Sequence, residues 1–167
     1  MAGTLTYPEV INNFNVYDDG DKMQGVSGEV TLPTLSAITT EISGGGVLGA
    51  YNTAVPGAFQ ATQMDIPFRM VGKEYFTRSI ADRQMNLTLR SSIQNVDRET
   101  GGTISSQGMR VVVRGRPTAY NFGTLSQGSL MNASITLELT YIMVEIGGEN
   151  LFELDKLNSI FKVNGVD

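Results

Sequence analysis

The chain carries few of the side chains that enzymes use for proton transfer or metal binding. It contains no histidine and no cysteine among its 167 residues. Ser-His-Asp and Cys-His nucleophiles, imidazole or thiolate zinc sites and disulfides are therefore excluded. An enzyme would have to rely on carboxylates such as Asp65, Glu138 or Glu145, and nothing in their spacing places two of them as a pair. The sequence predicts no catalytic residue, no metal site and no cofactor.

Three short motifs begin like known sites but lack the residues that would complete them. Residues 18–21, Asp-Asp-Gly-Asp, start like a calcium loop, yet the glycine and the distal glutamate of an EF-hand are not at the required spacing. The triple glycine at 44–46 is not followed by the Lys-Ser/Thr of a phosphate loop. Ser159 to Lys162 matches Ser-x-x-Lys without its companion motifs. We interpret the first motif as a turn and give the other two no catalytic meaning.

Three arginines share one face of a predicted strand over 109–116. In an extended chain Arg110, Arg114 and Arg116 alternate with apolar residues and glycine. Such a stripe could bind phosphates, but the net charge of −5 lacks the basic footprint of a nucleic-acid-binding protein. We favour an ion-pair face over a phosphate site.

Composition favours one mainly β domain over residues 1–167. The chain is 41% hydrophobic and 17% charged and contains 19 glycines, as expected for a folded protein rich in strands and turns. No apolar run approaches the roughly 20 residues of a membrane-spanning helix, and the N-terminal residues lack a signal-peptide pattern. We expect a chain without a membrane anchor, made in the cytoplasm.

The strand that organises the rest of the chain is predicted over 133–146. Apolar residues occupy its odd positions through Met143, and Ser134, Thr136, Glu138 and Thr140 occupy the even ones. One face should therefore be core and the other exposed to water. From Ile142 onward the even positions become apolar too, which predicts that this end is covered on both sides.

Alternation and turn residues predict the remaining elements. A hairpin is expected around the 18–21 turn, and Pro67 marks the strand over 62–70 as an edge or bulge. Lys73 to Arg83 is the one helical candidate. The predicted strands and turns are 13–17, 26–32, 62–70, 85–93, 109–116, a turn at 147–150 and a return strand at 151–155.

Residues 36–61 are rich in glycine, threonine and alanine and show no clear periodicity. They keep apolar side chains such as Leu48, Tyr51 and Phe59, which solvated linkers usually lack. A long stretch of this kind in a compact domain is normally functional or disordered. We expect an extended loop that becomes ordered against a partner.

Several short stretches, in this order and spacing, resemble the major tail tube protein family of contractile phage tails and R-type bacteriocins. The resemblance is strongest over 109–167 and good over 14–46. The stretches are Glu29-Val30-Thr31-Leu32-Pro33, Gly44-Gly45-Gly46, Val113-Arg114-Gly115-Arg116, Thr140-Tyr141, Glu153-Leu154-Asp155, and Asn158 followed by Lys162 to Asp167.

The resemblance implies a small antiparallel β-barrel or sandwich with one short helix, assembled as hexameric rings that stack into a tube. It implies a sheath protein outside, baseplate and terminator proteins at the ends, and DNA passing through without specific binding if the particle is a phage. The particle would be a virion tail or an extracellular tail-like particle assembled in the bacterial cytoplasm. Candidate residues are Gly44, Gly45, Gly46, Val47 and Leu48 for ring stacking, Met64, Ile66, Phe68, Arg110, Arg114 and Arg116 for lateral strand pairing, and Ser134, Thr136, Glu138, Thr140, Asn86 and Thr88 for the lumen.

Two rival interpretations remain at this point. One is a ring-forming protein of a type VI secretion system, and the other is a ligand-binding β-sandwich that recognises a glycan or a protein. The family usually has Met where this chain has Val47, and its members usually continue past Asp167 with a basic tail whose contacts are not carried over.

Overall fold

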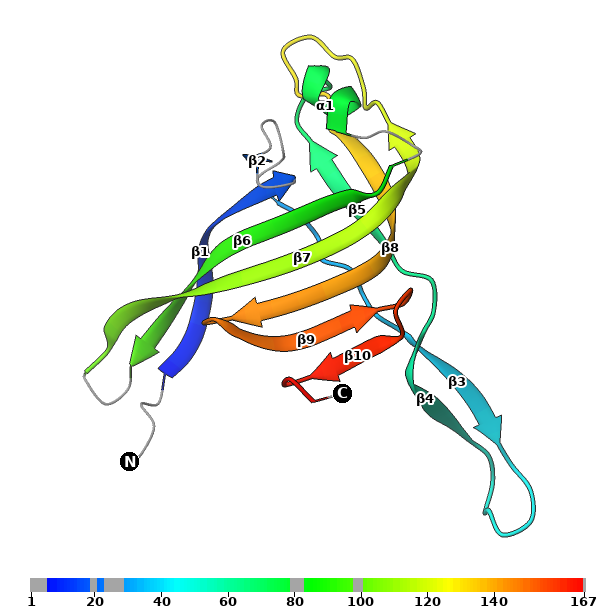
Figure 1. The fold of residues 1–167 in the computed structure, drawn as a ribbon. Helices are drawn as coiled ribbons and strands as arrows, with labels where there is room; N and C mark the ends of the chain where they lie inside the picture. The colour runs from blue at the N-terminus through cyan, green and yellow to red at the C-terminus, as the bar shows by residue number, and fades with distance from the viewer. Residues whose placement is uncertain (1–5, 19–20, 23–28, 79–82, 98–100, 167) are drawn as a thin grey trace.

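The structure, a computed structural model, describes residues 6–18, 21–22, 29–78, 83–97 and 101–166. Its main feature is an antiparallel sheet in the order β10-β9-β8-β7-β6-β1-β2, with β5 paired to the half of β8 that β9 leaves free (Figure 1). The elements are β1 Thr6–Asp18, β2 Asp21–Lys22, β3 Ala37–Ile42, β4 Tyr51–Phe59, β5 Gln63–Phe68, α1 Lys73–Arg78, β6 Met85–Asp97, β7 Thr103–Asn121, β8 Ala133–Ile146, β9 Glu149–Asp155 and β10 Ile160–Val163.

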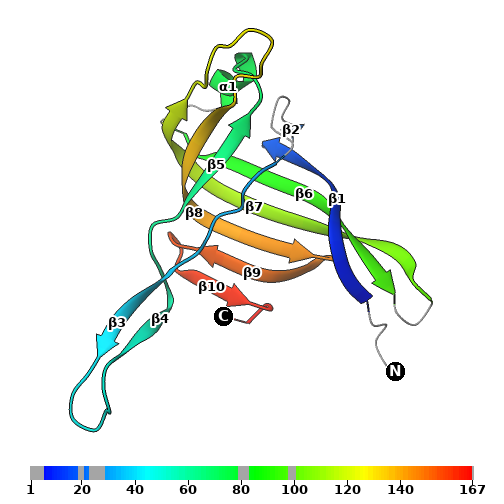
Figure 2. The same cartoon turned by 180° about the vertical axis from the view of Figure 1, so that it is seen from behind.

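The mainly β prediction is confirmed, but the chain does not form the predicted barrel or sandwich. No pairing within the described residues joins β10 to β1 or β2, so the sheet is open. The second sheet contains only β3 and β4 and projects away from the first (Figures 1 and 2). A single copy therefore leaves sheet edges that need pairing or protection.

The core lies on one face of the large sheet. Alternate side chains of β5, β6, β7 and β8 point to this face, and Ile66, Leu87 and Leu137 are fully enclosed. The irregular segment 29–36 crosses the same face on its way from β2 to β3, as Figure 2 shows, and packs Val30 and Leu35 against the core. This crossing segment stands where a sandwich would have its second sheet.

A β-bulge at Thr140 corrects the predicted face of the second half of β8. Arg114 is opposite Tyr141, but the next β7 residue is opposite Leu139, so Thr140 is an extra residue without a partner across β7. Beyond the bulge Ile142 is buried in the core. Tyr141 lies on the opposite face, which the even-numbered residues of β8 occupy before the bulge. The even apolar positions therefore mark a change of face and not a strand end that is covered on both sides.

Residues 36–61 form a hairpin and not the predicted irregular loop. β3 and β4 pair antiparallel from Ala37 opposite Phe59 to Ile42 opposite Tyr51, with a register shift near the base. We call this hairpin the arm and residues 43–50 the arm tip. Its strands are mostly exposed on both faces, so no alternation of apolar and polar residues was needed to form them.

Other boundaries differ from the predictions. The helix covers only Lys73–Arg78, Arg83 is not helical, and the rest of its predicted range lies outside the described residues. The turn after β1 pairs Asp18 with Asp21, but 29–32 is not a strand, and 23–28 lies outside the described residues. β7 is much longer than predicted because it continues beyond both ends of 109–116.

Candidate assembly surfaces

The residues predicted for the lumen lie together on the face of the sheet opposite the core, which we call the polar face. Ser134, Thr136 and Glu138 alternate with fully buried residues of β8 and are half-buried. Asn86 and Thr88 alternate in the same way on β6 and lie opposite β7 residues of this face. The hydroxyl of Thr140 accepts a hydrogen bond from Gln84 Nε2 at 2.9 Å.

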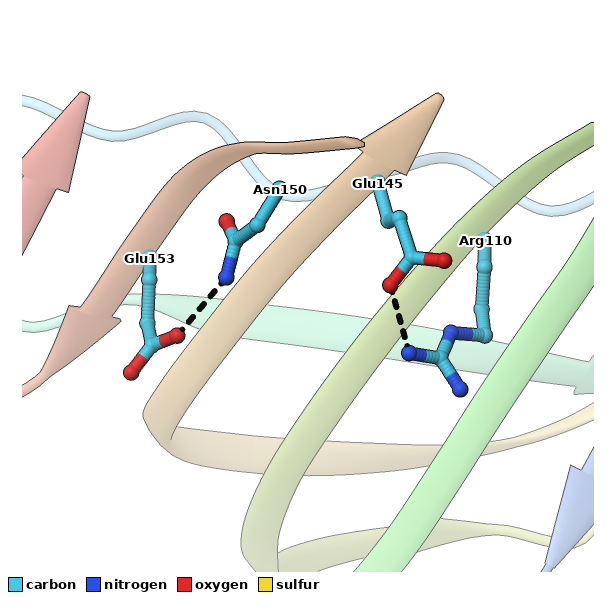
Figure 3. A network of polar contacts seen from close by, with 4 residues as sticks. All are labelled: Arg110, Glu145, Asn150 and Glu153. Carbon is cyan, nitrogen blue, oxygen red and sulfur yellow. Dashed lines mark hydrogen bonds and ion pairs between the residues drawn. The ribbon is translucent and has the colours of Figure 1, made fainter. Parts of the chain in front are cut away.

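The arginine stripe lies on the polar face, and each arginine has a carboxylate or an aromatic ring on the neighbouring strand β8. Arg110 donates to Glu145 Oε2 at 2.6 Å, which confirms an ion pair for this arginine (Figure 3). The guanidinium carbon of Arg114 lies 4.4 Å from the centroid of the Tyr141 ring, and Arg116 is opposite Glu138. The stripe is therefore interleaved with carboxylates and an aromatic ring, as an ion-pair face requires.

Hydrogen bonding and burial shift two pKa values on this face. The side-chain amide of Asn158, 2.7 Å from Asp155 Oδ2, holds the pKa of Asp155 below its usual value. The backbone amides of Leu157 and Asn158 also donate to its carboxylate, at 3.1 and 3.2 Å. Burial is the main reason that the pKa of Tyr141 is raised, with the Glu153 charge as the second cause. The hydrogen bonds from Leu157 and Asn158 allow Asp155 to cap the turn between β9 and β10.

The arm tip holds the residues predicted for ring stacking. Gly44, Gly46 and Gly49 have φ angles of 130°, 87° and 90°, and the amide of Val47 donates to the Gly44 carbonyl at 3.2 Å. Only glycine adopts such φ angles without strain. The turn thereby exposes Leu48 completely to solvent.

Aromatic residues at the base of the arm hold it against β9 and β10, and the sequence did not reveal them. The ring of Phe161 lies 5.4 Å from that of Phe59 and 5.7 Å from that of Phe152. Lys156 Nζ donates to the carbonyl of Gln60 at 3.0 Å. In the sequence these phenylalanines appear as isolated residues of three separate strands. They form a cluster only when β4, β9 and β10 meet.

The edge predicted at 64–68 exists, whereas most of the one predicted at 110–116 does not, since only Arg116 lies past the end of the pairing with β6. β5 pairs with β8 alone among the described strands, and a groove of about 620 Å³ lies between it and the 29–34 segment. The side chains of Met64, Ile66 and Phe68 are core residues, so only the backbone of this edge is available. β7 is paired on both sides from Arg110 to Gly115, so the prediction that this stretch is an edge is wrong.

Two other classes of site are absent from the part of the chain that the structure describes. Within it, no three acidic residues gather in a way that could hold a metal ion, and Asp19 and Gly20 of the predicted turn lie outside the described residues. None of its helices is both long enough and apolar enough to cross a membrane.

Comparison with known proteins finds similar proteins that match nearly the whole chain. Residues 8–167 match the model of the family described as phage tail tube protein FII. The chain is 29% identical to the tail tube protein of Escherichia phage P2 over 168 residues, which cover 98% of this chain and 94% of that protein. It is 30% identical to the major tail tube protein of Serratia phage KSP20 over 161 residues, covering 96% and 91% of the two chains.

The fold has a counterpart among solved structures. The cryo-EM structure of the sheath/tube terminator of an extracellular contractile injection system, PVC, in its extended state matches with a TM-score of 0.57 and 17% sequence identity. The match covers 83% of this chain and 97% of that one. With the family match over 8–167, these likenesses lead to one conclusion: the chain belongs to the phage tail tube protein FII family.

Proposed function

We propose that copies of this tail tube subunit form hexameric rings that stack into a rigid hollow tube. Contraction of a surrounding sheath would drive the tube through the target envelope, with baseplate and terminator proteins at its two ends. The channel would conduct DNA in a phage or ions in a bacteriocin-type particle. The subunit would assemble in the bacterial cytoplasm, and its role is mechanical and needs no catalytic residue.

One observation carries this proposal. A single open sheet separates an enclosed apolar face from a continuous polar face, and at least one of its edges is unpaired among the described residues. Unpaired edges of long strands favour association with further strands. Joining such sheets edge to edge around a ring would give a closed wall whose polar faces all point the same way.

In this ring the polar face lines the channel. The hydroxyls of Ser134, Thr136 and Thr88 would line the channel on the same face as Arg110, which is paired with Glu145, and Arg114, which contacts the ring of Tyr141. Free arginines would bind DNA phosphates and retain the strand. A face on which Arg110 is paired with a carboxylate, in an overall acidic chain, would let DNA pass without specific binding.

Lateral contacts would use the backbone of β5, and stacking would use the arm tip. The β5 edge carries Pro67, which cannot donate a hydrogen bond but leaves the neighbouring residues free to pair. The groove between β5 and 29–34 provides room for an added strand.

Electron microscopy of the purified chain tests the proposal, and we expect rings and tubes. A Thr88→Cys variant then tests the lumen, because the chain has no other cysteine. A small maleimide should label both monomer and tube, whereas a maleimide on a bulky polymer should label the monomer alone. Persistent monomer at high concentration beside sheath and baseplate partners would refute the tube, and bulky labelling of intact tubes would refute the lumen assignment.

A further inference from the structure

The end of the molecule opposite the arm tip carries an apolar surface that the proposed stacking role leaves without a function. Figures 1 and 2 place α1 and the loop 122–132 at one end and the arm tip at the other. Exposed apolar side chains gather on these elements and on the residues before α1. They are Met70, Phe76, Phe122, Leu125 and Leu130, and we call them the apical cluster.

The apical cluster rests on an ordered base. Tyr75 is buried and its hydroxyl lies 2.9 Å from the carbonyl oxygen of Ser134, which fixes α1 to the end of β8. The rings of Phe76 and Phe122 stack on each other at 5.9 Å, and both contact Tyr75. Phe76 is nevertheless 55% exposed and Phe122 is 54% exposed. These rings are held in place and still lack a covering layer.

The loop is held in place as well. The amide of Thr124 donates to the Met131 carbonyl at 2.9 Å, and the amide of Met131 donates to the Arg69 carbonyl at the same distance. Gly123 has a φ of 83°, and a side chain there would collide with the Met131 carbonyl. The loop therefore presents Leu125, 87% exposed, from a fixed backbone, and binding to it would cost little ordering entropy.

The loop at the apical end and the arm at the other end are poor in charge, although α1 beside the loop carries Lys73 and Arg78. Residues 117–137 contain no charged residue, and residues 36–61 contain only Glu41, although 17% of the whole chain is charged. Depletion of charge together with exposed aromatic and aliphatic groups is typical of the buried centre of a protein interface. A tube of identical subunits needs a head-to-tail contact, in which two different surfaces at opposite ends of the molecule fit each other.

We infer that the arm tip of one copy docks on the apical cluster of a copy in the next ring, with Leu48 inserted among Phe76, Phe122 and Leu125. The occupant is thus a second copy of this chain, contributing an uncharged turn to the uncharged 122–132 loop and the aromatic rings beside it. This inference rests on the proposed tube and adds the surface that receives the arm.

Introduced cysteines test the docking in a chain that has none of its own. In tubes of the double variant Leu48→Cys, Leu125→Cys, oxidation should link each copy to the next and convert most of the protein into a ladder of covalent oligomers. The two positions lie at opposite ends of one copy, so a bond within a chain is not expected. The matched control is Leu48→Cys, Ile104→Cys, because Ile104 is also well exposed but lies at the far end of β7.

The outcomes separate the two proposals. No ladder from Leu48→Cys, Leu125→Cys tubes, or an equal ladder from the control, would overturn the docking but leave the tube. Absence of tubes from the unmodified chain would count against the tube itself. If the double variant fails to assemble, a photoreactive residue at position 48 decides instead: cross-links to residues of the apical cluster, on 70–78 or 122–132, support the docking, and cross-links elsewhere, including to a sheath protein, overturn it.

Discussion

Arg114 and Tyr141 face each other across β7 and β8, with the guanidinium carbon 4.4 Å from the ring centroid. The pair marks the last position before the bulge, since Gly115 is opposite Leu139 and Thr140 is left over. The bulge is what turns Tyr141 toward the polar face and Ile142 toward the core. Without it, the second half of β8 would present its apolar residues to the wrong side.

Gly115 permits this bulge, and replacing it with alanine should destabilise the fold. A Cβ at Gly115 would collide with the backbone carbonyl of Glu138, which cannot move without shifting β8. Gly115→Ala should lower the free energy of unfolding by about 1–3 kcal/mol or more, as for an overpacked core. Gly108→Ala is the matched control, because it lies on the same strand with nothing within 4 Å of the added atom. Urea denaturation compares them, and equal stability would contradict the close approach.

The sequence predicted most strands of the sheet because burial on one face leaves an alternating pattern. β5, β6 and the first half of β8 follow that pattern directly. The bulge escaped because Thr140 continues the alternation, although Gly115 inside a strand was a usable signal for a bulge. The closed barrel was wrong because strand pairing within one chain does not follow from alternation.

The arm and its surroundings were harder to predict for a different reason. Its strands are stabilised by backbone pairing with little burial, so their side chains carry no period. The apical cluster depends on α1 meeting the 122–132 loop through Tyr75, a contact between residues far apart in the sequence. The absence of charge over 117–137 was readable, but its position at the end opposite the arm was not.

The Arg110–Glu145 pair should contribute modestly and in a salt-dependent way. The two side chains are 39% and 25% exposed, so solvent screens their attraction. Arg90 is directly opposite Arg110, and removing Glu145 would leave two facing cations. A double-mutant cycle with Arg110→Gln and Glu145→Gln should give a coupling free energy of about 0.5–1 kcal/mol, reduced at high salt. A cycle with Arg110→Gln and Glu153→Gln is the control, because Glu153 accepts from Asn150 instead; equal coupling in both cycles would contradict the pairing.

Asn158→Ala should weaken the Asp155 cap and change how stability depends on pH. The pKa of Asp155 is lowered from its ordinary 3.8 in the folded state, chiefly by the Asn158 side chain. Its stabilising contribution is therefore present above that ordinary value and is lost as pH falls toward the folded pKa. The variant should be less stable by about 1–2 kcal/mol at neutral pH and should lose less on acidification.

Urea unfolding between neutral and acidic pH measures this change. Asp155→Asn serves as the second variant, since it keeps an oxygen for the amides of Leu157 and Asn158 but cannot titrate in this range. The stability of this variant should likewise depend less on pH than that of the parent chain. If Asn158→Ala and the parent had the same free energy of unfolding at every pH, the cap would contribute nothing to stability.

The conformation of the arm tip, and not merely its lack of side chains, should decide stacking. Gly46 has a φ of 87°, whereas Gly45 is outside the left-handed region, and an added Cβ meets nothing within 4 Å at either position. Gly46→Ala should strain the turn by about 1 kcal/mol or more and redirect Leu48, while Gly45→Ala should leave the turn unchanged. Gly45→Ala should unfold at the same urea concentration as the parent, and Gly46→Ala should lose no more stability than the strain of the turn, because the arm tip packs against no part of the core. Electron microscopy should show short or absent tubes for Gly46→Ala and normal tubes for Gly45→Ala. If both shorten the tubes equally, the receiving surface excludes any added methyl group and the turn conformation is not the deciding factor.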